Sequence, residues 1–249
     1  MKKFLTTYLF LLLAVTGVFA SETEILKYVI SYKWGIVHKE AGDIKITKTP
    51  KAGGYELKLV GTSRPWADKI YSVRDTLISQ TAKDYYLPIK YTRLAHEKGK
   101  YGHDEINFSR SGATTKGKGI KYRQKKDGTV YSKDIDIQGT GPTYDLLSIL
   151  YYVRGLDYKS LGENRKVGVT VFSGDQVEKV TITTKGKEKI KLADKSERDA
   201  WHIVFKFTTH GGKKSSEDID CWFSDDASRI PLLIVGSLPV GQIRCTYVP

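Results

Sequence analysis

The sequence predicts an all-β protein, and three observations support this prediction. Tyrosine and glycine are abundant, with 16 Tyr and 23 Gly in 249 residues, and these residue types favour strands and turns respectively. Several segments alternate apolar and polar residues with a period of two, which is the pattern of half-buried strands. Apolar and aromatic residues make up 40% of the chain. That fraction is enough to bury a core, which excludes a disordered tail or a collagen-like chain.

The first alternating segment runs from Tyr28 to Ile36. Later segments repeat the pattern and are separated by turns rich in Gly and Asp, as in an antiparallel meander. We expect these further strands near residues 44–47, 55–59, 70–79, 85–96, 104–110, 117–125, 129–138, 167–172, 177–184, 201–207, 217–223, 230–237 and 241–248. The clearest hairpins are at Asp127-Gly128, where we expect a tight primed turn, and at Gly174-Asp175.

One segment departs from this alternation. Residues 143–154 carry leucine, tyrosine and valine at three-to-four spacing, which predicts one short amphipathic helix. Thr143 is placed to cap its start and Gly155 to end it. We expect this helix to cover one face of the sheet.

The first twenty residues have the pattern of a secretory signal peptide. Lys2 and Lys3 precede an apolar stretch, and Ala20 closes a cleavage site. The stretch is too short for a spanning helix, although an uncleaved anchor is the alternative. We therefore expect residues 1–20 to be removed and residues 21–249 to form a single β-rich domain, soluble and periplasmic, with no transmembrane segment after cleavage.

The chain is strongly basic, with a formal net charge of +13 at pH 7. A basic exported protein attracts anionic glycans, lipid phosphates or acidic proteins, whereas a nucleic-acid partner is not expected outside the cytoplasm. Lys187 and Lys189 belong to a row of lysines of one parity in a predicted strand. Such a row either protects a sheet edge from pairing or attracts an anionic group.

Cys221 and Cys245 are the only cysteines, and both share the apolar parity of their strands. Export makes a disulfide chemically feasible. In a simple meander, however, the two residues lie two strand spacings apart, roughly 10 Å, which exceeds the ~7 Å bridging limit. A disulfide and a pair of buried thiols therefore both stay open.

Two long motifs stand out. The helical segment from Asp145 to Arg154 reads Asp-Leu-Leu-Ser-Ile-Leu-Tyr-Tyr-Val-Arg, and the segment from Trp222 to Pro231 reads Trp-Phe-Ser-Asp-Asp-Ala-Ser-Arg-Ile-Pro. Both resemble motifs of the bacterial exported proteins grouped as domain-of-unknown-function family 3108. The resemblance, with weaker matches elsewhere, covers nearly the whole mature chain. It implies a large antiparallel sheet curled into a half-open barrel-like fold in the cell envelope, similar to carriers that hold lipid in a concave sheet. It supplies no catalytic residue.

The second motif has the composition of a tight turn that side-chain hydrogen bonds and an ion pair hold in place. Asp225 and Asp226 can accept hydrogen bonds from nearby backbone amides and build a tight turn, and Arg229 can pair bidentately with either carboxylate. A calcium or acid/base site is the alternative, but it needs further converging groups. Arg154, at the end of the predicted helix, is expected to stabilise the helix dipole.

No constellation of residues meets the requirements of catalysis. Hydrolysis needs a nucleophile, a base and an orienting group, and no Gly-x-Ser-x-Gly elbow occurs. The acid pairs that flank Ile135 and Ile219 are predicted to face solvent. His96 and His103 could meet across a hairpin, but surface polarity explains them equally well. We therefore expect no catalytic residue, no cofactor and no metal.

The sequence favours a non-catalytic binding protein of the envelope for an apolar or amphiphilic ligand, such as a lipid or glycolipid. Aromatic sheet faces would bound either a ligand cavity or a filled core. The candidate binding residues are Tyr32, Trp34, Trp201, Phe205, Lys187 and Lys189. The alternative is an assembly or scaffold protein that binds an envelope protein by strand addition, and a hydrolase is a third hypothesis.

Overall fold

The computed structural model describes residues 22–192, 194–209, 212–214, 216–237 and 241–249. The predicted signal peptide, residues 1–20, lies outside this part of the chain. Strands account for 68% of the structure and helices for 8%. The predicted all-β class is therefore confirmed.

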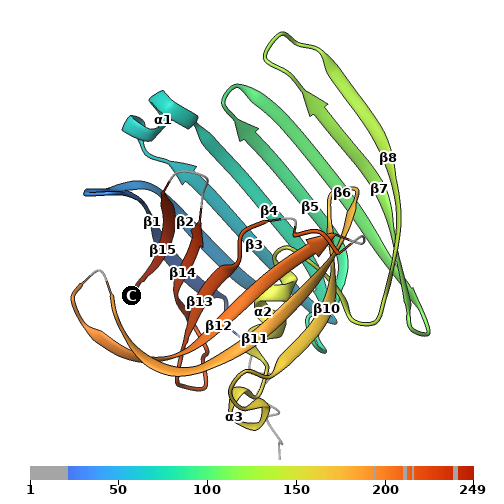
Figure 1. The fold of residues 1–249 in the computed structure, drawn as a ribbon. Coiled ribbons are helices and arrows are strands. Elements are labelled where there is room, and N and C mark those ends of the chain that lie inside the picture. Colours follow the sequence, from blue (N-terminus) through green and yellow to red (C-terminus); the bar gives the residue numbers. More distant parts are fainter. Residues whose placement is uncertain (1–21, 193, 210–211, 215, 238–240) are drawn as a thin grey trace, which may run out of the picture.

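The named strands all belong to one fifteen-stranded sheet (Figure 1). They are β1 (Glu24–Trp34), β2 (Val37–Lys51), β3 (Gly54–Ser63), β4 (Val73–Ala82), β5 (Pro88–Glu97), β6 (Lys100–Ser111), β7 (Thr114–Gln124), β8 (Val130–Thr140), β9 (Thr143–Asp145), β10 (Lys166–Ser173), β11 (Gln176–Lys191), β12 (Glu197–Thr209), β13 (Ile219–Ser224), β14 (Pro231–Ser237) and β15 (Gln242–Val248). Neighbours pair antiparallel except β9 and β10, which are parallel. The order follows the chain, except that β1 pairs with β15 and so brings the first and last strands together in the middle of the sheet.

The sheet curls into a nearly closed barrel with one unsealed seam between its two edges, β8 and β9. The β10–β11 hairpin reaches across this seam. The Asp175 carboxylate accepts from Nζ of Lys121 at 2.6 Å and from Nζ of Lys133 at 3.1 Å. The Phe172 ring lies against Gly117, where a Cβ atom would come within 2.8 Å of the ring. Side-chain contacts thus join the two parts of the sheet here, and the half-open barrel-like fold is confirmed.

The described residues contain three short helices, of which the sequence predicted one. They are α1 (Pro65–Tyr71), α2 (Ser148–Arg154) and α3 (Tyr158–Leu161). Helix α1 buries none of its seven residues and α3 has only four residues, so neither carries a clear amphipathic 3.6-residue period. The predicted end of α2 at Gly155 is confirmed, since the Gly155 N–H donates to the Tyr152 carbonyl at 3.0 Å.

Helix α2 begins later than predicted because residues 143–145 form the edge strand β9. Asp145, and not Thr143, organises the start of the helix. Its carboxylate accepts from the backbone N–H groups of Leu147 and Ser148, both at 2.8 Å. The Ser148 hydroxyl in turn accepts from the Asp145 N–H at 3.0 Å, so the two residues satisfy each other's backbone donors.

Both predicted hairpins are present, but only one has a two-residue turn. Ser173 and Gln176 are register partners around Gly174-Asp175, and Gly174 has a φ of +58°, as a type II′ turn requires at its first central residue. At the other hairpin only Gly128 has a positive φ, and the Lys125 N–H donates to the Thr129 carbonyl at 2.8 Å. That turn is therefore one residue longer than the primed turn predicted at Asp127-Gly128.

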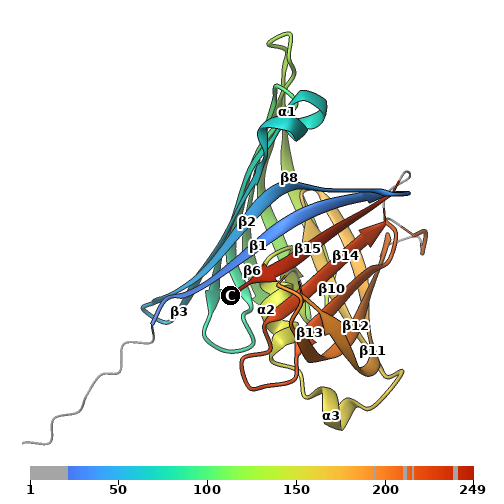
Figure 2. The same cartoon turned by 90° about the vertical axis from the view of Figure 1, so that its left-hand side faces the viewer.

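Helix α2 lies inside the curled sheet, between the wall of early strands and the wall of late strands (Figure 2). Its residues Ile149 and Val153 pack into a core cluster with β10–β13, whereas Tyr151 packs into a second cluster with β1–β3. The helix therefore contacts both sides of the barrel interior. Among the described residues, no helix combines the length and apolar character that crossing a bilayer requires.

Candidate ligand-binding cavity

An apolar cavity of about 200 Å³ lies between α2 and the inner face of the curled sheet. It is lined by Tyr28, Ile44, Ile46, Leu59, Leu146, Leu147, Ile149, Leu150, Phe205, Phe207, Ile219, Cys221, Ile234 and Cys245. Apart from one hydroxyl and two thiols, these side chains are hydrocarbon. Cavities of this character accept apolar molecules, and one of roughly 150 Å³ already holds benzene.

The sheet register assembles one wall of the cavity. It places Ile30, Cys245, Ile234, Cys221 and Ile203 side by side on five neighbouring strands, from β1 through β15, β14 and β13 to β12. Residues directly opposite one another share a face of the sheet, so this row points to the interior as a unit. The three central members of the row line the cavity.

Tyr28 gives this apolar wall one polar group. Its side chain is only 2% exposed, and its hydroxyl has no hydrogen-bond partner among the described residues. Burial, followed by the nearby Cys221 thiol, raises the pKa of Tyr28, so the hydroxyl keeps its proton at neutral pH. A buried hydroxyl without a partner costs about 1–3 kcal/mol. Its oxygen has almost no accessible surface, so a polar ligand atom would reach it only after neighbouring side chains move, and would then be favoured.

The two cysteines are free thiols in the structure. They lie on β13 and β15, and Ile234 of β14 stands in register between them, so the structure has the unbridged arrangement of the two that the sequence left open. Burial raises the pKa of Cys221 well above its usual value and that of Cys245 to about 11. Both thiols are therefore protonated near neutral pH and contribute apolar surface.

The start of α2 is tied to the sheet by a buried hydrogen bond. The Ser79 hydroxyl on β4 donates to the Asp145 carboxylate at 2.6 Å, and neither residue has exposed surface. Burial raises the pKa of Asp145, and its hydrogen bonds from Ser79 and the helix backbone oppose that shift. This contact holds the helix residues that line the cavity at a fixed distance from β4.

Arg154 ties the end of α2 to the first strand and to the 222–231 motif. Its guanidinium donates to the two Glu24 carboxylate oxygens at 2.6 and 2.8 Å and to the carbonyl oxygens of Ser228 and Arg229 at 2.8 and 3.1 Å. Burial opposes the ionisation of Glu24, but the hydrogen bond and charge of Arg154, with smaller contributions from Lys48 and Tyr151, together lower the Glu24 pKa. The two sequence motifs therefore meet at Arg154, a tertiary role that the predicted helix-dipole effect does not include.

The predicted turn at Asp226 is confirmed, but the predicted pairing of Arg229 is wrong. Asp226 accepts from the Ser228 N–H at 2.8 Å. The Arg229 guanidinium forms no ion pair with either neighbouring carboxylate in the described part of the chain. It lies 4.5 Å from the centre of the Tyr158 ring. Helix α3, which the sequence did not predict, supplies this aromatic surface, and a cation over a ring is stabilising.

The residues proposed from sequence as ligand contacts are not all in the cavity. Phe205 lines it. Trp201 faces the same core cluster, but its indole Nε1 donates to Asp225 at 2.6 Å. Lys187 pairs with the same carboxylate at 2.6 Å and lies over the Trp201 ring. Trp201 and Lys187 thus form a local cluster with the second motif.

The other three candidates lie elsewhere. Tyr32 lies further along β1 and does not line the cavity, and Lys189 is exposed on β11. The Trp34 side chain lies outside what the structure describes. The cavity is instead built from aliphatic residues of α2, β2, β3, β13 and β14. Their alternation marked them as buried, but alternation is the same for a filled core and for a cavity.

The residues considered for chemistry do not converge. Ile135 is buried and leaves its neighbours Asp134 and Asp136 exposed, as predicted. The His96 ring packs on Tyr101, 4.7 Å between centres. No three His, Cys, Asp or Glu side chains come together as a metal site in the described part of the chain.

A family model described as "Protein of unknown function (DUF3108)" matches residues 27–247. The chain belongs to this family. The match confirms the resemblance found in the sequence, and it includes all the residues that line the cavity. No curated protein matches this DUF3108 chain.

A solved structure supports the fold of this DUF3108 protein. The crystal structure of a beta-barrel-like protein of domain of unknown function DUF1849 from Brucella abortus superposes with a TM-score of 0.60 and 12% sequence identity. The alignment covers 90% of this chain and 94% of that one. At this identity the similarity establishes a shared barrel-like fold alone.

Proposed function

We propose that this protein is a non-catalytic binding protein of the cell envelope that holds an apolar group, such as the end of an acyl chain, beside α2. The observation that carries the proposal is the hydrocarbon-lined cavity of about 200 Å³. The cavity opens to solvent on one side, so an apolar ligand placed in it would displace water from a hydrocarbon lining. That exchange is favourable by roughly 25 cal/mol per Å² of apolar surface removed from water.

The size and lining of the cavity narrow the class of ligand. Pockets for drug-sized molecules usually exceed ~300 Å³, so this cavity fits a short segment of one chain. Tyr28 lines the cavity and holds a buried, unpartnered hydroxyl behind this lining. A small side-chain movement would let a hydroxyl or carbonyl group of an amphiphile pair with it. The envelope location rests on the export signal predicted at residues 1–20.

The first experiment asks whether the protein carries a ligand. The mature protein is purified from an envelope extract without organic solvent and studied by native mass spectrometry, followed by extraction of any bound molecule. We expect a retained lipid or other amphiphile. Bare protein that also fails to bind added 1-octanol, followed by protein NMR chemical shifts, would contradict the proposal.

A cavity-filling variant locates the binding. Ile234→Phe adds volume to the central cavity wall, and we expect it to weaken 1-octanol binding at least about tenfold, since small ligands gain little contact outside a cavity. Ile89→Phe is the matched control, because Ile89 is 52% exposed on β5 and does not line the cavity. If both variants lost the same affinity for 1-octanol, or if neither lost any, the binding site would lie outside this cavity.

A second candidate function is recruitment of an envelope protein by strand addition. The observation in its favour is that β8, an edge of the sheet, is eleven residues long, with Val130 and Tyr131 58% and 53% exposed. Crosslinking from position 130 in envelope extracts tests it. A specific protein adduct would support strand addition, and its absence would leave the cavity as the functional site.

A further inference from the structure

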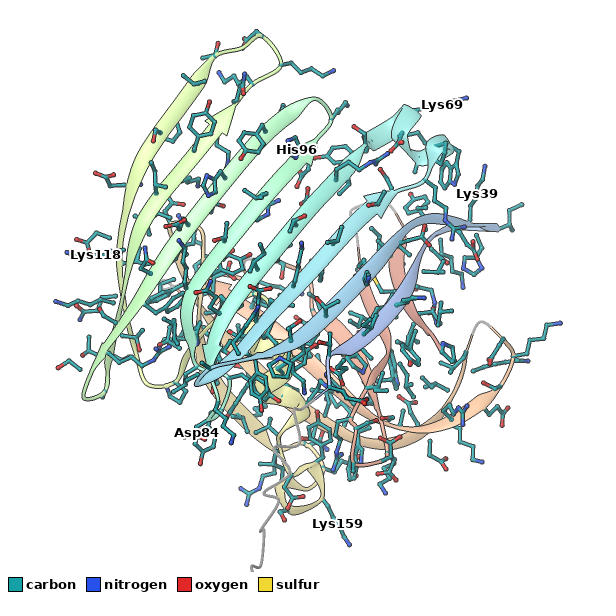
Figure 3. All side chains as sticks on the ribbon, turned by 180° about the vertical axis from the view of Figure 1, so that it is seen from behind. Lys39, Lys69, Asp84, His96, Lys118 and Lys159 are labelled. Atoms are coloured by element: carbon teal, nitrogen blue, oxygen red, sulfur yellow. The ribbon has the colours of Figure 1, made fainter. Side chains whose placement is uncertain are left out.

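A separate polar cavity of about 410 Å³ lies among the hairpin tips of β4–β8, far along the sheet from α2 (Figure 3). It is lined by Ser72, Arg74, His96, Gly99, Lys100, Tyr101, Gln124, Lys125, Lys126 and Gly128. We call it the tip pocket. His96 marks its position near the ends of the strands in Figure 3.

The tip pocket gathers more positive charge than its neighbouring carboxylates neutralise. Arg74, Lys100, Lys125 and Lys126 line it, and no Asp or Glu does. Arg74 is held by Asp68 at 2.8 Å. The three lysines take part in no ion pair within the described ranges of the chain. All three are exposed, so their ammonium groups are free to turn toward an anion in the pocket, which their combined charge would attract.

The β5–β6 turn and the β7–β8 turn are in contact with each other, and this contact forms the pocket. A Cβ atom at Gly99 in the β5–β6 turn would lie 2.9 Å from Cε of Lys126 in the β7–β8 turn. The aliphatic part of the Lys126 side chain therefore passes directly over Gly99. The φ of Gly99 is +74°, which also favours glycine at this position. Beside it the His96 and Tyr101 rings pack together as an aromatic floor, with 4.7 Å between their centres and their planes tilted by 41°.

We propose that the tip pocket binds a phosphate group, carried either by a soluble phosphorylated compound or by a lipid headgroup. Asp68 neutralises only one of the four cationic side chains, Arg74. A phosphate group carries up to two negative charges and several oxygens, so it can accept hydrogen bonds from the remaining lysines. The aromatic floor offers an apolar face to the rest of such a molecule. This inference is independent of the apolar cavity, which lies beside α2.

The soluble arm of the test uses inorganic pyrophosphate as the probe, followed by isothermal titration calorimetry at matched ionic strength. A triple variant, K100Q/K125Q/K126Q, removes the pocket lysines. The matched control, K166Q/K189Q/K191Q, removes three exposed lysines on β10 and β11. We expect the pocket variant to bind at least about tenfold more weakly than wild type, as the loss of even one charge-assisted contact implies. The control should keep wild-type affinity.

The lipid arm uses co-sedimentation with vesicles of phosphatidylglycerol or of phosphatidylcholine, on the same three proteins. Binding to anionic vesicles that only the pocket variant loses identifies a headgroup site. Lysine-dependent pyrophosphate binding without vesicle binding identifies a soluble phosphate compound. Equal losses in pocket and control variants would show that net charge alone attracts anions, and absence of binding in both arms would overturn the proposal. Near-ultraviolet circular dichroism checks that each variant is folded.

Discussion

At the scale of single residues, Tyr28 is the most informative side chain. It is the only residue with a hydroxyl among the described side chains that line the apolar cavity, and it is buried without a partner. Natural proteins satisfy nearly all buried polar groups, and each exception calls for a reason. A ligand oxygen that pairs with the Tyr28 hydroxyl would be such a reason.

The Tyr28 hydroxyl is therefore expected to lower the stability of the free protein. Tyr28→Phe should raise the free energy of unfolding by about 1 kcal/mol, because it removes an unsatisfied buried group and keeps the ring. Urea denaturation measures this, and the same variant should lose the preference of the cavity for 1-octanol over octane.

Tyr158→Phe is the matched control for that prediction. The Tyr158 hydroxyl is also buried, but it donates to the Val153 carbonyl at 2.7 Å. Its loss should lower the free energy of unfolding by about 1 kcal/mol. If both variants changed stability in the same direction, the Tyr28 hydroxyl would have a partner in solution, and the argument for a polar ligand atom would fail.

At the scale of elements, α2 depends on contacts that reach far along the chain. Glu24 on β1, Arg154 at the helix end and the 224–230 turn form one hydrogen-bonded group. Removing one charged member of such a group strongly destabilises a protein, because the other charge is left buried without a partner. The helix can therefore keep its place beside a cavity, where packing alone gives it less support.

This contact predicts a pH dependence of stability. The Glu24 pKa in the folded protein lies below its ordinary value, so Glu24 contributes stability that is present above its unfolded pKa near 4.5 and is lost as pH falls through the lower folded value. Glu24→Gln should be less stable than wild type at pH 7, and the difference should shrink as the pH falls toward 3. Urea titrations across this range check it; a difference that grew in acid would contradict the assignment.

The sequence predicted the elements better than the site. Strand positions followed from alternation, because the sheet has one buried and one exposed face over most of its length. The edge strand β9 was missed because three residues carry no period, and α3 because it has four residues. Phe205 was found as a cavity residue, but Ile234 and Leu59 were not singled out. Inward-facing residues either touch each other or leave a cavity, depending on the distance between α2 and the sheet. The alternation of apolar and polar residues along the sequence does not determine that distance.

At the scale of the whole molecule, the seam is the place where the barrel depends on side chains alone. Asp175 connects the β10–β11 hairpin to two lysines, Lys121 on β7 and Lys133 on β8. Hydrogen bonds from these lysines lower the Asp175 pKa well below its ordinary value, although burial opposes the shift. The pairing is thus fully charged at neutral pH.

Breaking this link should loosen the seam without unfolding the barrel. Asp175→Asn is expected to speed amide hydrogen exchange in β8 and in the β10–β11 hairpin, because the facing edges then keep only apolar contacts and weaker hydrogen bonds such as that from Thr170 Oγ1 to the Thr140 carbonyl at 3.0 Å. Asp136→Asn is the control, since Asp136 meets Lys118 at 3.7 Å on the exposed face of β8. Unchanged exchange in the Asp175 variant would mean that Phe172 packing suffices to hold the seam.

The pairing of β1 with β15 has a consequence for how the protein reaches its fold. Lys27 in β1 pairs with Val248 in β15, so the ladder that joins the two parts of the sheet closes a loop of nearly the whole domain. Contacts of such sequence separation form slowly, because the entropy of closing the loop is lost before they stabilise anything. Until the last strand arrives, β1 and β14 each present an unpaired edge, and such edges invite pairing with other chains. A chain that has not yet added its final strand is therefore more prone to aggregate than the completed sheet, in which β1 and β14 both have partners.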